Sequence, residues 1–179
     1  FQIRKEPGST RVVGGMWHSD LSHLPEPPLG SILYALETPS AGGDTLFANQ
    51  YMAYESLSDG MKRMLGGMRA VHDNRIQSPK AAGKSNSEMT TKLRDDLDEE
   101  EEPESEHPVI LTHPETGRKS LFINIGRSHR FADMTEEESR PLLDYLIAHS
   151  HKPEFTCRFR WRDGSVAFWD NRCLLHRTL

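Results

Sequence analysis

The segment Trp17-His18-Ser19-Asp20 places an imidazole and a carboxylate two positions apart. In extended backbone, residues i and i+2 point to the same face, so His18 and Asp20 can converge on one metal ion. One histidine nitrogen and one carboxylate oxygen are two ligands of a 2-His-1-carboxylate facial triad, which leaves open positions on a non-haem iron. A lone His-x-Asp pair also fits an ordinary loop or strand end, so by itself it is weak evidence.

The third ligand must come from elsewhere in the chain. Periodicity does not choose among the remaining histidines, which are His23, His72, His107, His113, His129, His149, His151 and His176. We expect His107 and His113 at the surface, because they flank a strand-like run. His149 and His151 come at a predicted helix end, where a cation interacts favourably with the helix dipole. His176 differs through its neighbours, which begin with Trp-Asp-Asn-Arg at 169–172.

Four separated motifs occur along the chain. They are Trp-His-Ser-Asp at 17–20, Gly-Gly-Asp-Thr at 42–45, His-Pro-Val at 107–109 with Thr-His-Pro-Glu-Thr-Gly-Arg-Lys-Ser-Leu at 112–121, and Trp-Asp-Asn-Arg-x-x-x-His at 169–176. In this order they resemble the taurine dioxygenase (TauD/TfdA-like) family of Fe(II)- and 2-oxoglutarate-dependent dioxygenases. The resemblance covers nearly the whole chain.

The resemblance implies a role for particular residues. His18, Asp20 and His176 would bind Fe(II), and Thr45 would contact a carboxylate of 2-oxoglutarate, since a threonine hydroxyl can donate one hydrogen bond. The implied activity is that of an oxidoreductase that hydroxylates a small organic acid with O2 and decarboxylates 2-oxoglutarate to succinate. Trp17 and Trp169 are expected to pack around the site. The implied fold is a distorted double-stranded β-helix, a jelly roll.

The sequence departs from the family pattern in two respects. Family members carry an arginine, roughly ten or more residues after the distal histidine, that clamps the other 2-oxoglutarate carboxylate. That position lies beyond Leu179, and Arg177 does not match it; we therefore expect a sequence truncated at both ends.

The second departure concerns the substrate. The taurine enzyme has an asparagine at the position of Gly14 and a phenylalanine at that of Arg127, so taurine itself is not favoured. Arg127 could pair with an anionic substrate or lie exposed at the surface. The Arg172-Cys173 and His176-Arg177 pairs favour an aryloxyalkanoate; a sulfonate or a sulfate ester is also consistent with the family.

Composition sets broader limits. The chain has 179 residues, 35% of them hydrophobic and 27% charged, which fits one globular domain. A formal net charge of -5 argues against nucleic acid as a partner. No apolar run approaches the roughly 20 residues that span a bilayer. Cys157 and Cys173 cannot form a disulfide framework, so we expect reduced thiols and a cytoplasmic protein. The family resemblance predicts a homo-oligomer.

The predicted elements are mainly strands with inserted helices. Strands are expected at 31–37, 107–112, 121–125, 154–161 and 165–169, with a hairpin turn at 114–117 and a second turn at 162–164. Helices are expected at 50–66, where Ser58 could cap a second piece, and at 135–149, where Thr135 and Glu138 fit a capping box. An antiparallel β core follows from this pattern.

Two side-chain patterns predict the core. Met61, Met64, Leu65 and Met68 recur at helical spacing, and a second apolar face carries Leu142, Leu143, Leu146 and Ile147. Residues 74–106 differ, because they are polar and then strongly acidic. Such an insert is either disordered or an active-site lid.

Two other classes remain open on the sequence. A hydrolase could bind Zn²⁺ through the same ligands, because zinc also accepts histidine and carboxylate around an open position. A non-catalytic jelly-roll module could retain the fold and lack the cosubstrate. The Gly-Gly-Asp-Thr and Trp-Asp-Asn-Arg motifs have no role in a zinc hydrolase, which favours the dioxygenase.

Overall fold

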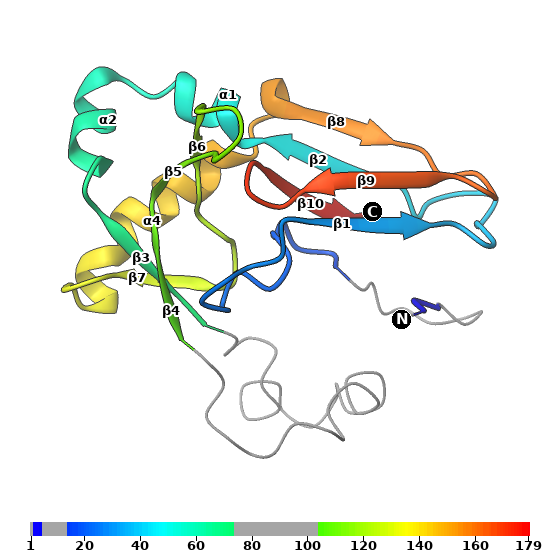
Figure 1. The fold of residues 1–179 in the computed structure, drawn as a ribbon, viewed down its shortest axis with the longest axis horizontal. Helices are drawn as coiled ribbons and strands as arrows, with labels where there is room; N and C mark the ends of the chain where they lie inside the picture. The colour runs from blue at the N-terminus through cyan, green and yellow to red at the C-terminus, as the bar shows by residue number, and fades with distance from the viewer. Residues whose placement is uncertain (1, 5–13, 74–103) are drawn as a thin grey trace, which may run out of the picture.

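A computed structural model describes residues 2–4, 14–73 and 104–179 (Figure 1). Most of the predicted polar insert, with its suggested lid role, lies outside these ranges. The strand predicted from residue 107 begins at Ser105, within the last residues of that segment.

The described chain is mainly β with a few helices, as the pattern predicted. In order, the elements are β1 (Gly30–Tyr34), β2 (Thr45–Asn49), α1 (Gln50–Glu55), α2 (Asp59–Leu65), β3 (Arg69–His72), β4 (Ser105–Pro108), β5 (Ile110–Thr112), β6 (Lys119–Leu121), β7 (Ser128–Phe131), α4 (Glu136–Ser150), the 3-10 turn η2 (Pro153–Phe155), β8 (Thr156–Phe159), β9 (Val166–Asp170) and β10 (Leu174–Thr178). No helix among these is long and apolar enough to cross a membrane.

Two antiparallel sheets face each other at one end of the molecule. One has the order β10-β2-β8 and the other pairs β1 with β9. Trp169 of β9 lies between them, with its ring centroid 5.5 Å from that of Phe47 on β2 and 4.8 Å from that of His176 on β10. In Figure 1 the two sheets lie together, away from α2 and α4.

Most of the other described elements surround a larger apolar core. Its sheet has the order β4-β3-β7, next to the β5-β6 hairpin. Helix α1 packs on β6 and α4 on β7. The buried residues of this core are Ala53, Leu57, Leu65, Ala70, Val109, Leu121, Ile123, Phe131, Leu143, Leu146 and Phe155.

The predicted helices are confirmed where local signals define them. Thr135 accepts from the Glu138 backbone while the Glu138 side chain accepts from the Thr135 backbone, which completes the capping box of α4. Leu143 and Leu146 are fully buried. The predicted helix 50–66 is two helices, because Ser58 is in extended conformation and caps α2 through the Met61 amide.

The methionine stripe is confirmed in part. Leu65 is fully buried, and Met61 and Met68 pack against the core around it. Met64 is the exception, since it is 50% exposed. Helix α2 has seven residues and begins only at Asp59, so its buried face is narrower than the four-residue pattern suggested.

Several predicted strands have other boundaries or partners. The 107–112 strand breaks at Val109, so that β4 pairs with β3 while β5 forms the predicted hairpin with β6. The predicted strand at 121–125 is wrong beyond Leu121, because β6 ends at that residue. β1 ends at Tyr34, short of the predicted residue 37. The strands flanking the turn at 162–164 do not pair, because β8 joins β2 and β9 joins β1.

A buried polar network fixes the loop that follows Asp20. His72 lies between the hydroxyls of Ser22 and Ser128, at 3.0 and 2.9 Å from its two ring nitrogens. Asn124 donates to Ser22 Oγ at 2.6 Å and to the Ser19 carbonyl at 2.8 Å. Burial, with smaller effects of neighbouring cationic groups, lowers the pKa of His72 to about 3. The network therefore holds a neutral imidazole.

The depressed pKa of His72 makes the folded state sensitive to acid. Between about pH 6.5 and 3 the unfolded chain binds a proton at this position that the folded chain does not, so stability falls as the pH falls. The share of one group is at most about 1.4 kcal/mol per pH unit. We expect His72→Gln to show a shallower dependence of the free energy of unfolding on pH between 6.5 and 4.5, measured by urea denaturation. Equal slopes in both proteins would contradict this assignment.

Candidate metal centre

Two reciprocal backbone hydrogen bonds bring the distant motifs together. The His18 amide donates to the His176 carbonyl at 2.9 Å, and the His176 amide donates to the His18 carbonyl at 2.8 Å. Directly opposed residues of an antiparallel pair project to the same side. The two imidazoles consequently lie with their centroids 4.1 Å apart.

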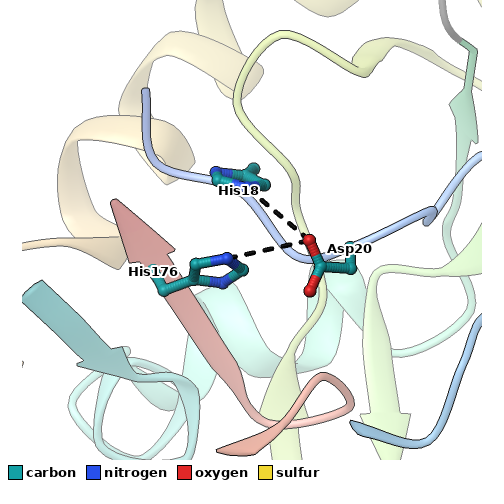
Figure 2. Close-up of side chains that lie close together, drawn as sticks. All are labelled: His18, Asp20 and His176. Atoms are coloured by element: carbon teal, nitrogen blue, oxygen red, sulfur yellow. Dashed lines mark ion pairs between the residues drawn. The ribbon is translucent and has the colours of Figure 1, made fainter. Parts of the chain in front are cut away.

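Asp20 supplies the third donor group. Its Oδ1 lies 3.6 Å from His18 Nε2 and 3.7 Å from His176 Nε2 (Figure 2). The donor atoms of all three residues lie within 4.8 Å of one another, so the three side chains form a group that could hold one metal ion. The structure thus brings together the three residues that the sequence singled out.

The surroundings of the two imidazoles suit metal binding through Nε2 of His18 and a neutral His176. Nδ1 of His18 lies 2.8 Å from the Met16 carbonyl, which can only accept, so Nδ1 donates to it and Nε2 is the nitrogen left for a metal. Burial, followed by the nearby His18, lowers the pKa of His176 to about 4, against a smaller opposing effect of Asp20. Its imidazole is neutral at pH 7.

Two further clusters of potential ligands among the described residues each contain a carboxylate that an arginine already binds. In the His113–Asp170–Cys173 group, Arg172 donates to both oxygens of Asp170 at 2.9 and 2.6 Å, while His113 lies 3.0 Å away. Burial would raise the pKa of Asp170, but these hydrogen bonds lower it to about 2. In the Asp73–Glu104–His129 group, Glu104 pairs with Arg130 at 2.8 Å. The arginine pairing of Asp170 and Glu104 makes these two clusters weaker candidates for a metal than the triad.

Thr45 lies on the same face of the sheet as His176. It opposes Thr178 in the β10–β2 register, two positions from the His176–Phe47 pair, and side chains two apart share a face. The Trp161 indole N–H donates to Thr45 Oγ1 at 2.9 Å. The hydroxyl proton of Thr45 is thereby left for another acceptor. Trp161 was not singled out from the sequence, because only the fold brings it to β2.

The Gly-Gly-Asp-Thr motif forms a turn with left-handed backbone. Gly42 and Gly43 have φ of 78° and 72°, values that side chains other than glycine rarely adopt. Arg158 donates to Asp44 Oδ2 at 2.6 Å, and the Leu179 amide donates to the Asp44 carbonyl at 2.9 Å. The turn therefore fixes the start of β2 and with it Thr45.

Gly14 touches the site through the backbone. Its φ is +70°, and a Cβ there would lie 3.2 Å from Cε1 of His18. Its carbonyl accepts from the Thr178 amide at 2.8 Å. The glycine thus packs against a proposed ligand, and any larger residue presses on that imidazole.

Arg127 is buried, so the alternative that it lies exposed is wrong. Its NH1 donates to Nδ1 of His23 at 2.9 Å. Burial and then Arg127 lower the pKa of His23 to about 4, while Asp73 opposes the shift. His107 and His113, expected at the surface, are also buried; His113 binds Asp170 and His107 lies 3.0 Å from the Leu24 carbonyl.

Both tryptophans pack as expected. Trp17 is 6% exposed and joins Ala48 and Leu175 in a small core behind the site. Trp169 is 8% exposed and rests against His176. Cys157 and Cys173 are free thiols, in agreement with the prediction.

This fold and site match one family of known proteins. The profile of the taurine catabolism dioxygenase TauD, TfdA family matches residues 3–178, and the chain belongs to this family. Its members are 2-oxoglutarate-dependent dioxygenases, which use Fe(II) and O2.

Individual relatives give the same result. The chain is 36% identical over 176 residues to the alpha-ketoglutarate-dependent 2,4-dichlorophenoxyacetate dioxygenase of a Burkholderia species, covering 96% of this chain and 56% of that one. It is 34% identical to an alkylsulfatase of Acinetobacter baylyi, with 98% and 54% covered.

Solved structures agree. A crystal structure of AAD-2 in complex with Mn(II) and N-oxalylglycine superposes with a TM-score of 0.77 at 28% identity, over 93% of this chain and 58% of that one. The chain spans about half the length of the relatives it matches.

The contact of Gly14 with His18 can be separated from backbone strain. Gly14→Ala and Gly42→Ala both force alanine into left-handed backbone, at about 1 kcal/mol each, but only Gly14 faces an imidazole, since nothing lies within 4 Å of a Cβ on Gly42. We expect similar losses in urea stability and weaker Mn(II) binding for Gly14→Ala alone, measured by electron paramagnetic resonance of free Mn(II). Equal Mn(II) affinities would show that the contact does not matter.

Proposed function

We propose that this chain forms the iron centre of an Fe(II)- and 2-oxoglutarate-dependent dioxygenase that hydroxylates a small organic acid. The observation that carries the proposal is the convergence of His18, Asp20 and His176 in a member of this family. Their donor set, two imidazoles and one carboxylate, is that of the facial triad of non-haem iron oxygenases.

The surroundings of each proposed ligand favour metal binding. The Met16 carbonyl accepts from Nδ1 of His18 and so leaves Nε2 for a metal, and burial keeps the His176 imidazole neutral, the form that binds a metal. Among the described residues, Asp20 has no lysine or arginine ion pair, so its charge is available to a cation. When bound, Fe(II) with 2-oxoglutarate and O2 supplies the oxidation, and the protein supplies geometry and exclusion of water.

Thr45 fits a cosubstrate role. Because Trp161 donates to its oxygen, the Thr45 O–H is free to donate toward an anion on the His176 face. A hydrogen bond to a charged carboxylate is worth about 1.5–3 kcal/mol. This matches the contact that the family pattern assigns to this threonine.

The substrate class rests on relatives and on chemistry. The relatives act on a phenoxyacetate and, by its name, an alkyl sulfate, both of which carry an anionic group. We place an aryloxyalkanoate first, with sulfonates and sulfate esters as the other members of the class. Arg127 and Gly14 stay predictions as substrate determinants, and the jelly roll and the homo-oligomer are also proposed on the family resemblance.

The reaction class can be tested directly. For the full-length protein with Fe(II), ascorbate and 2-oxoglutarate, we expect succinate formation that a 2,4-dichlorophenoxyacetate, alkylsulfonate or alkyl sulfate substrate stimulates. His176→Ala should abolish it, and Fe(II) with 2-oxoglutarate should give a visible charge-transfer band without oxygen. A folded protein that binds Zn²⁺ but forms neither the band nor succinate would overturn the proposal.

The Trp161–Thr45 hydrogen bond predicts a defect in cosubstrate binding. Trp161→Phe retains a ring and removes the N–H, so the Thr45 hydroxyl loses its orientation. We expect the apparent KM for 2-oxoglutarate to rise about 3- to 10-fold, as for loss of one hydrogen bond of about 1 kcal/mol, with Mn(II) affinity unchanged. A change in Mn(II) affinity with no change in this KM would place Trp161 elsewhere in the mechanism.

A further inference from the structure

A chain of hydrogen bonds leads from the β9 strand to the carboxylate of Asp20. The Trp169 indole N–H donates to Asn171 Oδ1 at 3.1 Å, Asn171 Nδ2 donates to Ser31 Oγ at 3.1 Å, and Ser31 Oγ donates to Asp20 Oδ2 at 2.5 Å. These four residues come from three segments of the chain, and neither Ser31 nor Asn171 has a role in the reaction proposed above.

Trp169 fixes the direction of this series of hydrogen bonds. An indole N–H can only donate, so the Asn171 atom that faces it must be the oxygen. The Asp20 backbone amide reaches the same oxygen at 3.4 Å, which supports the same orientation. The Asn171 NH2 group then faces Ser31 and occupies a lone pair of its hydroxyl oxygen. The remaining Ser31 proton is directed to Asp20.

Burial makes this orientation costly to change. Asn171 is 2% exposed and Trp169 is 8% exposed, so a reversed amide would leave buried donors facing each other. The Asn171 backbone is also held, because its carbonyl accepts from Ser19 Oγ at 2.7 Å and its amide donates to the Leu29 carbonyl at 2.9 Å. The strand register places Ser31 opposite Trp169.

The two oxygens of Asp20 therefore have different surroundings. Oδ2 accepts a short hydrogen bond from Ser31, whereas Oδ1 lies nearest both histidine Nε2 atoms. We propose that Ser31, oriented by Asn171 and Trp169, is a positioning residue that reserves Oδ2 and so presents Asp20 to the metal through Oδ1 alone. A carboxylate that used both oxygens would occupy a position that cosubstrate or O2 needs. This inference rests on the proposed metal site.

The test compares Ser31→Ala with Ser31→Thr. Alanine removes the proton donated to Oδ2, and threonine restores a hydroxyl in a strand position that favours β-branched residues. We expect Ser31→Ala to weaken Mn(II) binding about 10- to 100-fold, the usual effect of losing a partner of a metal ligand, and to change the visible bands of bound Co(II). Ser31→Thr should restore both. Ser165→Ala is the matched control, because its Oγ accepts from the Arg162 amide in a turn before β9, away from the ligands.

A second variant tests whether the hydrogen bonds from Trp169 through Asn171 orient Ser31. Trp169→Phe keeps an aromatic side chain but removes the N–H that sets the direction, so it should weaken Mn(II) binding in the same sense. The double variant with Ser31→Ala should be no weaker than Ser31→Ala alone, because both changes disrupt one chain. Urea unfolding of each apoprotein separates these effects from loss of the fold.

The outcomes are distinguishable. If the wild-type protein binds no Mn(II), or binds it unchanged in Asp20→Asn, the proposed metal site itself fails. If binding depends on Asp20 but Ser31→Ala leaves both the affinity and the Co(II) spectrum as in wild type, the metal site stands and the positioning role is overturned. Additive effects of Ser31→Ala and Trp169→Phe would overturn the chain through Asn171.

Discussion

The backbone pair between His18 and His176 is the constraint on which the site depends. Two hydrogen bonds of 2.9 and 2.8 Å join the segment before β1 to the centre of β10, and they fix how far apart the two imidazoles can lie. Asp20 follows two residues later, so the same pair sets its position. Trp17 supports the pair from behind, because its ring packs with Ala48 and Leu175 in a small core.

Two histidines near this pair are buried as uncharged imidazoles. His72 and His23 have pKa values lowered to about 3 and 4, so the interior around the 18–24 loop holds uncharged imidazoles at neutral pH. Asp170 keeps its charge but is compensated by Arg172 and His113. Asp20 differs, because its Oδ1 faces two imidazole nitrogens whose lone pairs can all meet one cation. The negative charge of Asp20 therefore lies at the proposed metal position without an arginine or lysine partner among the described residues.

Helices and turns that depend on residues close together in the sequence were predicted well. The α4 helix has the capping box and the apolar face that its sequence indicates, and the β5–β6 hairpin follows its Pro-Glu-Thr-Gly turn. Strand pairing was not predictable in the same way. The strands around Arg162–Gly164 look like a hairpin, but each finds its partner far away in the chain, because burying Trp169 between two sheets requires β8 and β9 to diverge.

The sequence by itself determined the chemical groups of the site. His18 and Asp20 are two residues apart, and the distal motif singles out His176 once the family resemblance is seen, so the proposed ligand set needed no coordinates. The tertiary structure decided which side chains hydrogen-bond to the site residues and orient them. Trp161, Ser31 and Asn171 reach Thr45 and Asp20 only because antiparallel sheets bring distant segments into register, and a hydrogen bond across such a distance leaves no periodic signal in the sequence.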